Sequence, residues 1–147
     1  MINDMDGEKK RLLQFLCPTT EKLRILVIES CAYLPELRNM MPQAELSAVT
    51  ADELAAEELK RRKLDVYFEI MDYREKVLPY EKENFDYIIA ERCLEEGDNP
   101  QDMAAGIGQY IKQTGFLLTS FRNIRHWKVS KAVMTGHFYY FCRFFDA

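Results

Sequence analysis

The chain lacks several patterns by which the function of a protein is commonly recognised. Its four cysteines form no Cys-x-x-Cys pair and have no pair of histidines nearby, so we expect reduced thiols and no bound metal. The net charge of −4 argues against a broad nucleic-acid-binding surface. No apolar run has the length of a membrane span, and the polar start MINDMDGEKK is no secretory signal. These absences predict a cytoplasmic protein that binds neither nucleic acid nor membrane.

Glycine is also scarce, which matters most in the stretch LRILVIESCAYLPEL at residues 23–37. Only six residues of the chain are glycine, and none lies in this stretch. An apolar strand that leads to an acidic residue is usually followed, in nucleotide-binding α/β domains, by a glycine-rich turn. Here Ser30 and Ala32 add a Cβ and Leu34 adds a whole side chain, so these residue types suit cofactor binding poorly. A pocket blocked by Leu34 would indicate a lost cofactor site, and an open pocket lined by Glu29 and Asp72 a live one.

What the chain has is enough apolar sequence for one core. Its 147 residues are 48% hydrophobic, which favours a single domain over residues 1–147. Short apolar runs bounded by turn residues predict buried strands; they lie at 23–28, 45–50, 66–71, 85–90 and 116–120. Helical patterns lie between them, at 35–41, 52–63 and 100–114, the last ending at Gly115.

Strands that alternate with helices or irregular crossovers predict an α/β fold with a doubly wound, mostly parallel, Rossmann-like sheet. We expect an N-terminal helix within residues 1–20, the Rossmann core at 21–121, and a helix plus an aromatic edge strand at 122–147. Ligands of such folds bind at the carboxyl ends of the strands. The chemistry should therefore follow Ile28, Val49, Met71, Ala90 and Ser120.

The middle of the chain, MDYREKVLPYEKENFDYIIAERCLEEGDNP, carries a family resemblance. The segments that carry it are Asp72, Leu78-Pro79-Tyr80, Asn84-Phe85-Asp86, Leu94-Glu95-Glu96 and Asn99-Pro100. In order and spacing they resemble class I S-adenosylmethionine-dependent methyltransferases of the type-11 or type-23 branch. The later stretch TGFLLTSFRNIRHW resembles that family's fifth strand and the segment after it. The resemblance covers about residues 20–140 and implies a methyltransferase-like fold, reduced at its C-terminus.

The resemblance also implies a set of cofactor-binding positions for S-adenosylmethionine. They are Glu29, Ser30, Ala32, Thr50, Asp52, Asp72, Tyr73, Ala90 and Glu91. Several depart from the family pattern: the glycine loop is degenerate, and Thr50 stands where the family has the acid that holds the ribose. Asp72, expected near the adenine, matches the pattern.

Each of these positions also has a plain structural alternative. For Asp52 the favoured interpretation is a helix cap, because the helix that follows is clear, whereas Asp72 is equally a turn residue. Glu91, Glu95 and Glu96 suggest a metal site or a carboxylate acid–base pair, and Glu91 and Glu95 would share one face if their segment is helical. A solvated acidic loop edge is the favoured alternative. For the segment RNIRHWKVSK, a solvated helix face outweighs nucleic-acid binding.

Two functions from different classes follow. In the first, cofactor binding is impaired or lost, and the chain is an interaction module for a small molecule, a protein partner or itself, as a homodimer through the C-terminal aromatic strand. In the alternative, it is an active small-molecule or glycan-pathway methyltransferase. The sequence predicts no catalytic residue, so whether the chain is an enzyme stays open here.

Overall fold

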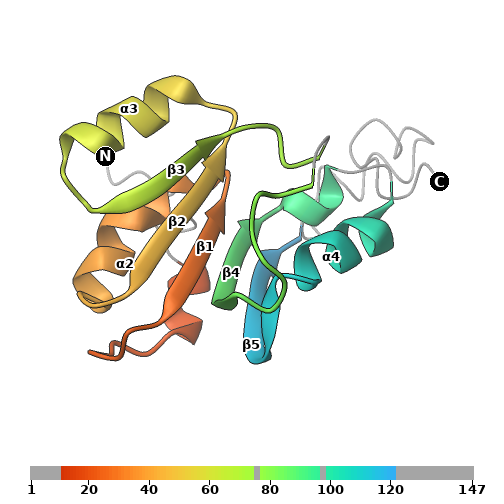
Figure 1. Ribbon diagram of the computed structural model, residues 1–147, viewed down its shortest axis with the longest axis horizontal. Helices are drawn as coiled ribbons and strands as arrows, with labels where there is room; N and C mark the ends of the chain where they lie inside the picture. The colour runs from red at the N-terminus through yellow and green to blue at the C-terminus, as the bar shows by residue number, and fades with distance from the viewer. Residues whose placement is uncertain (1–10, 75–76, 97–98, 122–147) are drawn as a thin grey trace, which may run out of the picture.

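The computed structural model describes residues 11–74, 77–96 and 99–121. A five-stranded sheet lies at its centre, in the order β3-β2-β1-β4-β5. All four neighbouring pairs are parallel, and Figure 1 shows the strands fanning across the molecule. The strands are β1 (Arg24–Ile28), β2 (Glu45–Thr50), β3 (Val66–Ile70), β4 (Phe85–Glu91) and β5 (Ile111–Ser120). The predicted α/β class with a mostly parallel Rossmann-like sheet is confirmed.

Central strands are apolar because both of their faces are covered. In β1 the four residues from Ile25 to Ile28 are fully buried. Alternate side chains enter two separate cores, with Ile25 and Val27 on one face and Leu26 and Ile28 on the other. A run without polar alternation is the pattern of a strand buried on both faces.

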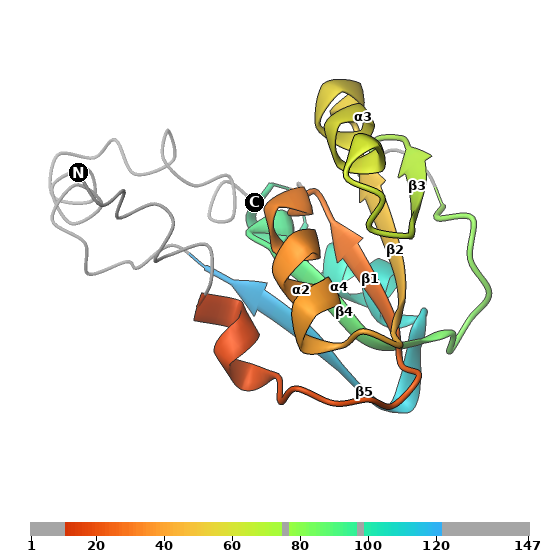
Figure 2. The ribbon, with the colours of Figure 1, turned by 90° about the vertical axis from the view of Figure 1, so that its left-hand side faces the viewer.

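The helices divide between these two faces. Helix α2 (Leu34–Met40), helix α3 (Glu53–Arg61) and the 3-10 turn η1 (Arg11–Phe15) supply Leu34, Leu37, Leu59 and Leu13 to the first core. Helix α4 (Pro100–Gly108) supplies Ile107 to the second. Figure 2 shows α2 and α4 on opposite sides of the sheet. The sheet is therefore wound on both faces, as the alternation of segments predicts.

One predicted boundary is wrong. The helix expected over residues 100–114 ends at Gly108, and β5 begins at Ile111. The β4–β5 register shifts between Phe85 and Tyr87, which pair with Ile111 and Phe116. Gly115 lies in this irregular stretch, where an added Cβ would stand 2.7 Å from the Asp86 carbonyl oxygen. This glycine allows a close backbone approach inside a strand and does not end a helix.

Other predictions fall wholly or partly outside the described residues. The N-terminal helix was expected within residues 1–20, where the structure describes the 3-10 turn η1. The helix and the aromatic edge strand expected at 122–147, with the homodimer expected through that strand, lie outside the described residues. Within the described ranges, no helix has the length and apolar character needed to cross a membrane.

Candidate functional site

Glu29 follows β1 and links the carboxyl ends of two neighbouring strands. Its backbone is left-handed, with a φ of 58°, a conformation that costs a non-glycine residue about 1–2 kcal/mol. Its amide donates to the Val49 carbonyl of β2 at 2.8 Å. Its carboxylate accepts bonds from the Thr50 hydroxyl at 3.1 Å and the Ala51 amide at 2.9 Å. The residue is exposed, so an acid reaches the end of β2 from β1.

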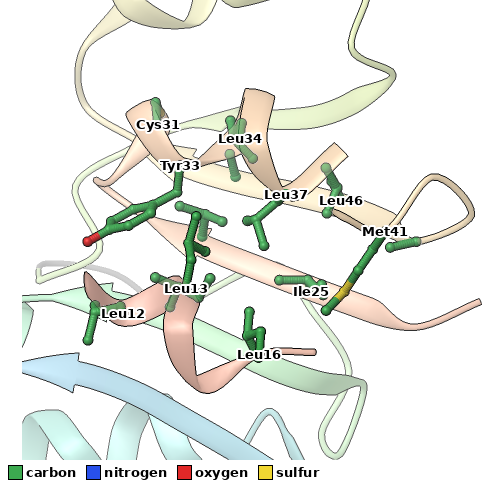
Figure 3. Close-up of a cluster of buried hydrophobic side chains, with 14 of the residues drawn as sticks. Leu12, Leu13, Leu16, Ile25, Cys31, Tyr33, Leu34, Leu37, Met41 and Leu46 are labelled. Atoms are coloured by element: carbon green, nitrogen blue, oxygen red, sulfur yellow. The ribbon is translucent and has the colours of Figure 1, made fainter. Parts of the chain in front are cut away.

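The glycine-free loop after Glu29 folds into a short 3-10 turn, η2 (Cys31–Tyr33), which runs directly into α2. Ser30 precedes the turn and its carbonyl accepts the Tyr33 amide at 3.1 Å. Ala32 is exposed. Leu34 is fully buried in the first core, beside Leu37 (Figure 3). The Leu34 side chain packs into the core beneath α2, which favours an open turn over one blocked by Leu34.

The two positions predicted after β2 have structural partners. Thr50 is buried. Its hydroxyl donates to the Glu29 carboxylate and accepts a bond from the Asp52 amide at 3.0 Å. Asp52 is the N-cap of α3 and accepts the Ala55 amide at 3.1 Å. Asp52 is therefore a helix cap, as the structural alternative predicts. The carboxylate bonded to the end of β2 is that of Glu29.

Asp72, after β3, is paired within its own loop. The Arg74 guanidinium donates to both of its carboxylate oxygens, at 3.0 and 2.8 Å. Side-chain and backbone bonds from Arg74 lower the pKa of Asp72 below its usual range. Arg74 is not among the residues predicted for the site; its signal is the presence of an arginine two residues from Asp72, since a guanidinium can hold a carboxylate through two bonds. A ligand that needs Asp72 must share it with this arginine or displace it.

Tyr73 is a buried member of the second core. Its hydroxyl donates to the Cys93 carbonyl and lies equally close, at 3.3 Å, to the Glu96 carboxylate. Burial is the main cause that raises its pKa. A cavity of about 490 Å³ opens between this loop and α4, with Tyr73, Arg74, Met103 and Gly106 in its wall. Its volume is within the range of small-molecule pockets.

Ala90 and Glu91 end β4 next to β1. Ala90 is fully buried and its carbonyl accepts the Thr119 hydroxyl at 2.8 Å. Glu91 is half-buried and still part of the strand, so it does not share a helical face with Glu95. Arg92 has a left-handed backbone, with a φ of 56°.

The two buried thiols are poorly suited to nucleophilic roles. Burial raises the pKa of Cys31, and it raises that of Cys93 to about 12. Among the residues that the structure describes, no group of three or more histidine, cysteine or carboxylate side chains is placed to hold a metal ion.

The structure therefore gathers Glu29, Ser30, Thr50 and Asp52 at the ends of β1 and β2. Asp72 and Tyr73 follow β3, and Ala90 and Glu91 end β4. All belong to the carboxyl edge of one parallel sheet, where folds of this kind bind ligands. The chemistry of this edge is acidic and hydroxylic, suited to polyhydroxyl groups and to cations.

No family model matches this chain, and no curated protein sequence matches it either. Solved structures do. A methyltransferase dependent on S-adenosylmethionine from Aquifex aeolicus superposes with a TM-score of 0.59 at 17% identity, covering 87% of this chain and 78% of that one. Coclaurine N-methyltransferase, bound to N-methylheliamine and S-adenosylhomocysteine, gives a TM-score of 0.62 at 18% identity, covering 76% of this chain and 33% of that one.

The [4+2]-cyclase SpnF is similar to the same degree. Its TM-score is 0.61 at 21% identity, covering 76% of this chain and 43% of that one. A cyclase among these structures shows that the shared architecture does not fix the reaction. The chain spans about half the length, or less, of several of these proteins. Sheet order, winding and these superpositions together give this chain the fold of the class I S-adenosylmethionine-dependent methyltransferases.

Proposed function

We propose that the carboxyl edge of the sheet binds S-adenosylmethionine and that the chain is a small methyltransferase. The observation that carries the proposal is the exposed Glu29 carboxylate, held between the ends of β1 and β2 by Thr50 and Ala51. A carboxylate can accept two hydroxyl bonds at once, which suits the two hydroxyls of a ribose. The family resemblance implies a ribose-binding acid at the end of β2, and the bonds of Glu29 to Thr50 and Ala51 support Glu29 in that role.

The residues present fit the cofactor in part. Glu29 keeps unused acceptor capacity, since each carboxylate oxygen takes one bond from the described residues. Leu34 leaves the turn unobstructed because it is buried in the core. Against this, Asp72 is already bonded by Arg74. We expect binding through Glu29, the backbone from Ser30 to Ala32, and Tyr73.

When bound, S-adenosylmethionine supplies an electrophilic methyl group. The chain's own contribution is to hold the donor along β1–β3 and an acceptor beyond Ala90 and Glu91. Alignment of two reactants accounts for much of the rate enhancement in such reactions, so a site without an obvious acid–base pair is compatible with activity.

The test is a calorimetric titration of the full chain with S-adenosylmethionine and S-adenosylhomocysteine. Loss of the charged acceptor in Glu29→Gln removes about 2–3 kcal/mol, a 30- to 150-fold loss of affinity. Glu57→Gln is the matched control, because it removes one carboxylate from the exposed face of α3. Asp72→Ala should weaken binding less than Glu29→Gln, since Arg74 already occupies both oxygens. Absence of binding by the wild-type chain at millimolar ligand would overturn the proposal.

A second candidate function rests on the Asp72–Arg74 pair. If Arg74 keeps Asp72 closed to ligand, cofactor affinity falls and the chain acts as a binding module without methyl transfer. Arg74→Ala separates the two functions: a gain in S-adenosylhomocysteine affinity means that the pair competes with the cofactor. The module's partner would then be a small molecule, another protein or a second copy of the chain.

A further inference from the structure

The cavity of about 490 Å³ between the β3–β4 connection and α4 lies on the face of the sheet that the second core covers. Leu78 from the connection and Ile107 from α4 both line it and both belong to that core. Figure 1 shows the connection crossing the same face of the sheet as α4. Glu29 and Thr50 are not in its wall, so the cavity is separate from the ends of β1 and β2.

Buried hydrogen bonds fix the two sides of this cavity. The Leu78 amide donates to the Tyr110 hydroxyl at 3.1 Å, and that hydroxyl donates to the Leu78 carbonyl at 3.3 Å. The Tyr73 hydroxyl donates to the Cys93 carbonyl at 3.3 Å. Leu78, Tyr73 and Tyr110 all line the cavity, which is therefore formed before any ligand binds, as is usual for small-molecule sites.

The wall is largely apolar, and Gly106 leaves it open on the side of α4. Met103 and Ile107 line the cavity from the helix, and Val77, which lines it from the connection, is 83% exposed. A Cβ added at Gly106 would have no heavy atom within 4 Å. Glycine weakens a helix relative to alanine. Here it leaves space that a larger side chain would fill.

The charged groups around the cavity are mostly acidic. Arg74 is in the wall, but its guanidinium donates to both oxygens of Asp72, and its Nη1 atom lies 3.9 Å from the Glu96 carboxylate. Asp102, also in the wall, has no ion pair or side-chain hydrogen bond with any described residue. Three carboxylates thus face one guanidinium, which favours a cationic ligand over an anionic one.

We propose that this cavity binds an organic cation, a small molecule with an apolar body and a protonated amine. The body packs against Leu78, Met103 and Ile107, and the amine pairs with the Asp102 carboxylate. The ligand binds without any covalent step. The site shares Tyr73 with the proposed cofactor site, but it does not depend on cofactor binding or on methyl transfer.

The probe is phenethylamine, an aliphatic amine that is protonated at pH 7. Its neutral and anionic counterparts are 2-phenylethanol and phenylacetate, and each is titrated into the full chain and followed by ligand-observed NMR. We expect the amine to bind about 3- to 5-fold more tightly than the alcohol, the advantage of one solvent-exposed ion pair. Phenylacetate should bind most weakly of the three.

Variants on α4 locate the site. Gly106→Leu fills the cavity and should weaken both amine and alcohol at least about 10-fold. Gly108→Leu is the matched control, because this glycine also faces open space but lies outside the cavity wall. Asp102→Asn should lower the affinity for the amine to that for the alcohol and leave the alcohol unchanged. Glu57→Gln, on α3, is the control for net charge.

Circular dichroism checks that each variant folds, and the comparison of the three probes needs no variant. No binding of phenethylamine at millimolar concentration, or binding no tighter than that of the alcohol, would overturn the proposal. Equal affinities in Gly106→Leu and Gly108→Leu would also overturn it. Amine binding that Glu29→Gln leaves unchanged supports a site distinct from that of the cofactor, whether or not S-adenosylhomocysteine binds.

Discussion

Replacing Tyr33 with phenylalanine should stabilise the free protein, which is unusual for a change at a core residue. The ring is 2% exposed and its hydroxyl has no partner in the described part of the chain. A buried polar group without a bond costs about 1–3 kcal/mol. Phenylalanine keeps the ring and removes only the oxygen, so the loss of packing is small. We expect the free energy of unfolding to rise by about 1 kcal/mol, and Tm by about 3 °C for a chain of this length.

The assay is urea unfolding followed by circular dichroism, with matched controls on β5. Ser120→Ala removes another unbonded hydroxyl and should also leave stability unchanged or raise it. Thr119→Val removes a hydroxyl that donates to the Ala90 carbonyl at 2.8 Å, and should cost about 1 kcal/mol.

Destabilisation of about 1 kcal/mol or more by Tyr33→Phe would refute the reasoning. It would mean that the hydroxyl is bonded in the free protein, with the Glu91 carboxylate as its acceptor.

Three further predictions concern the frame that holds the site, and each is measured by urea unfolding. Arg38→Met should cost about 3 kcal/mol, because the guanidinium donates to the carbonyls of Leu64, Asp65, Ala44 and Pro42; Arg38→Lys should recover part of the loss. Asp52→Ala should cost about 1 kcal/mol, through loss of the cap of α3, and no change would show that the cap contributes nothing. Gly115→Ala should cost about 2 kcal/mol or more, because its Cβ would meet the backbone of β4, whereas Gly106→Ala meets open space and should stabilise α4; similar effects from the two would contradict the reported close approach.

The sheet could be predicted from the sequence because its strands are short apolar runs between clear breaks. The stretch 45–50 is observed as a strand with the predicted bounds, and β1 differs by one residue. Asp52 begins α3 as predicted, since an acid before a helical pattern satisfies free amides at the helix start. These are local signals, and local signals survive folding when the tertiary contacts agree with them.

The predictions that failed depend on contacts between distant residues. The sequence alone predicts that Gly115 ends a helix. Its close approach to the carbonyl groups of β4 is seen only in the structure. The sequence alone leaves open whether Leu34 blocks the loop or packs in the core, and in the structure it is a fully buried core residue. The approach of Tyr33, in the turn after β1, to Glu91 at the end of β4 joins residues far apart in the chain, and no sequence spacing encodes it.

The same edge of the sheet shows why a loop without glycine can still serve a ligand. Glu29 and Arg92 both have left-handed backbones, at the carboxyl ends of neighbouring strands. Glycine would adopt this conformation without strain, whereas glutamate at position 29 strains the backbone. Favourable interactions of the glutamate side chain must compensate for that cost. The bonds of its carboxylate to Thr50 and Ala51 supply that offset. Glu29→Gly should therefore relieve the backbone and lose the carboxylate, whereas Glu29→Gln keeps the strain and loses only the charge. If both abolish cofactor binding while Glu29→Gly folds at least as stably as Glu29→Gln, the strained backbone exists to present the acid.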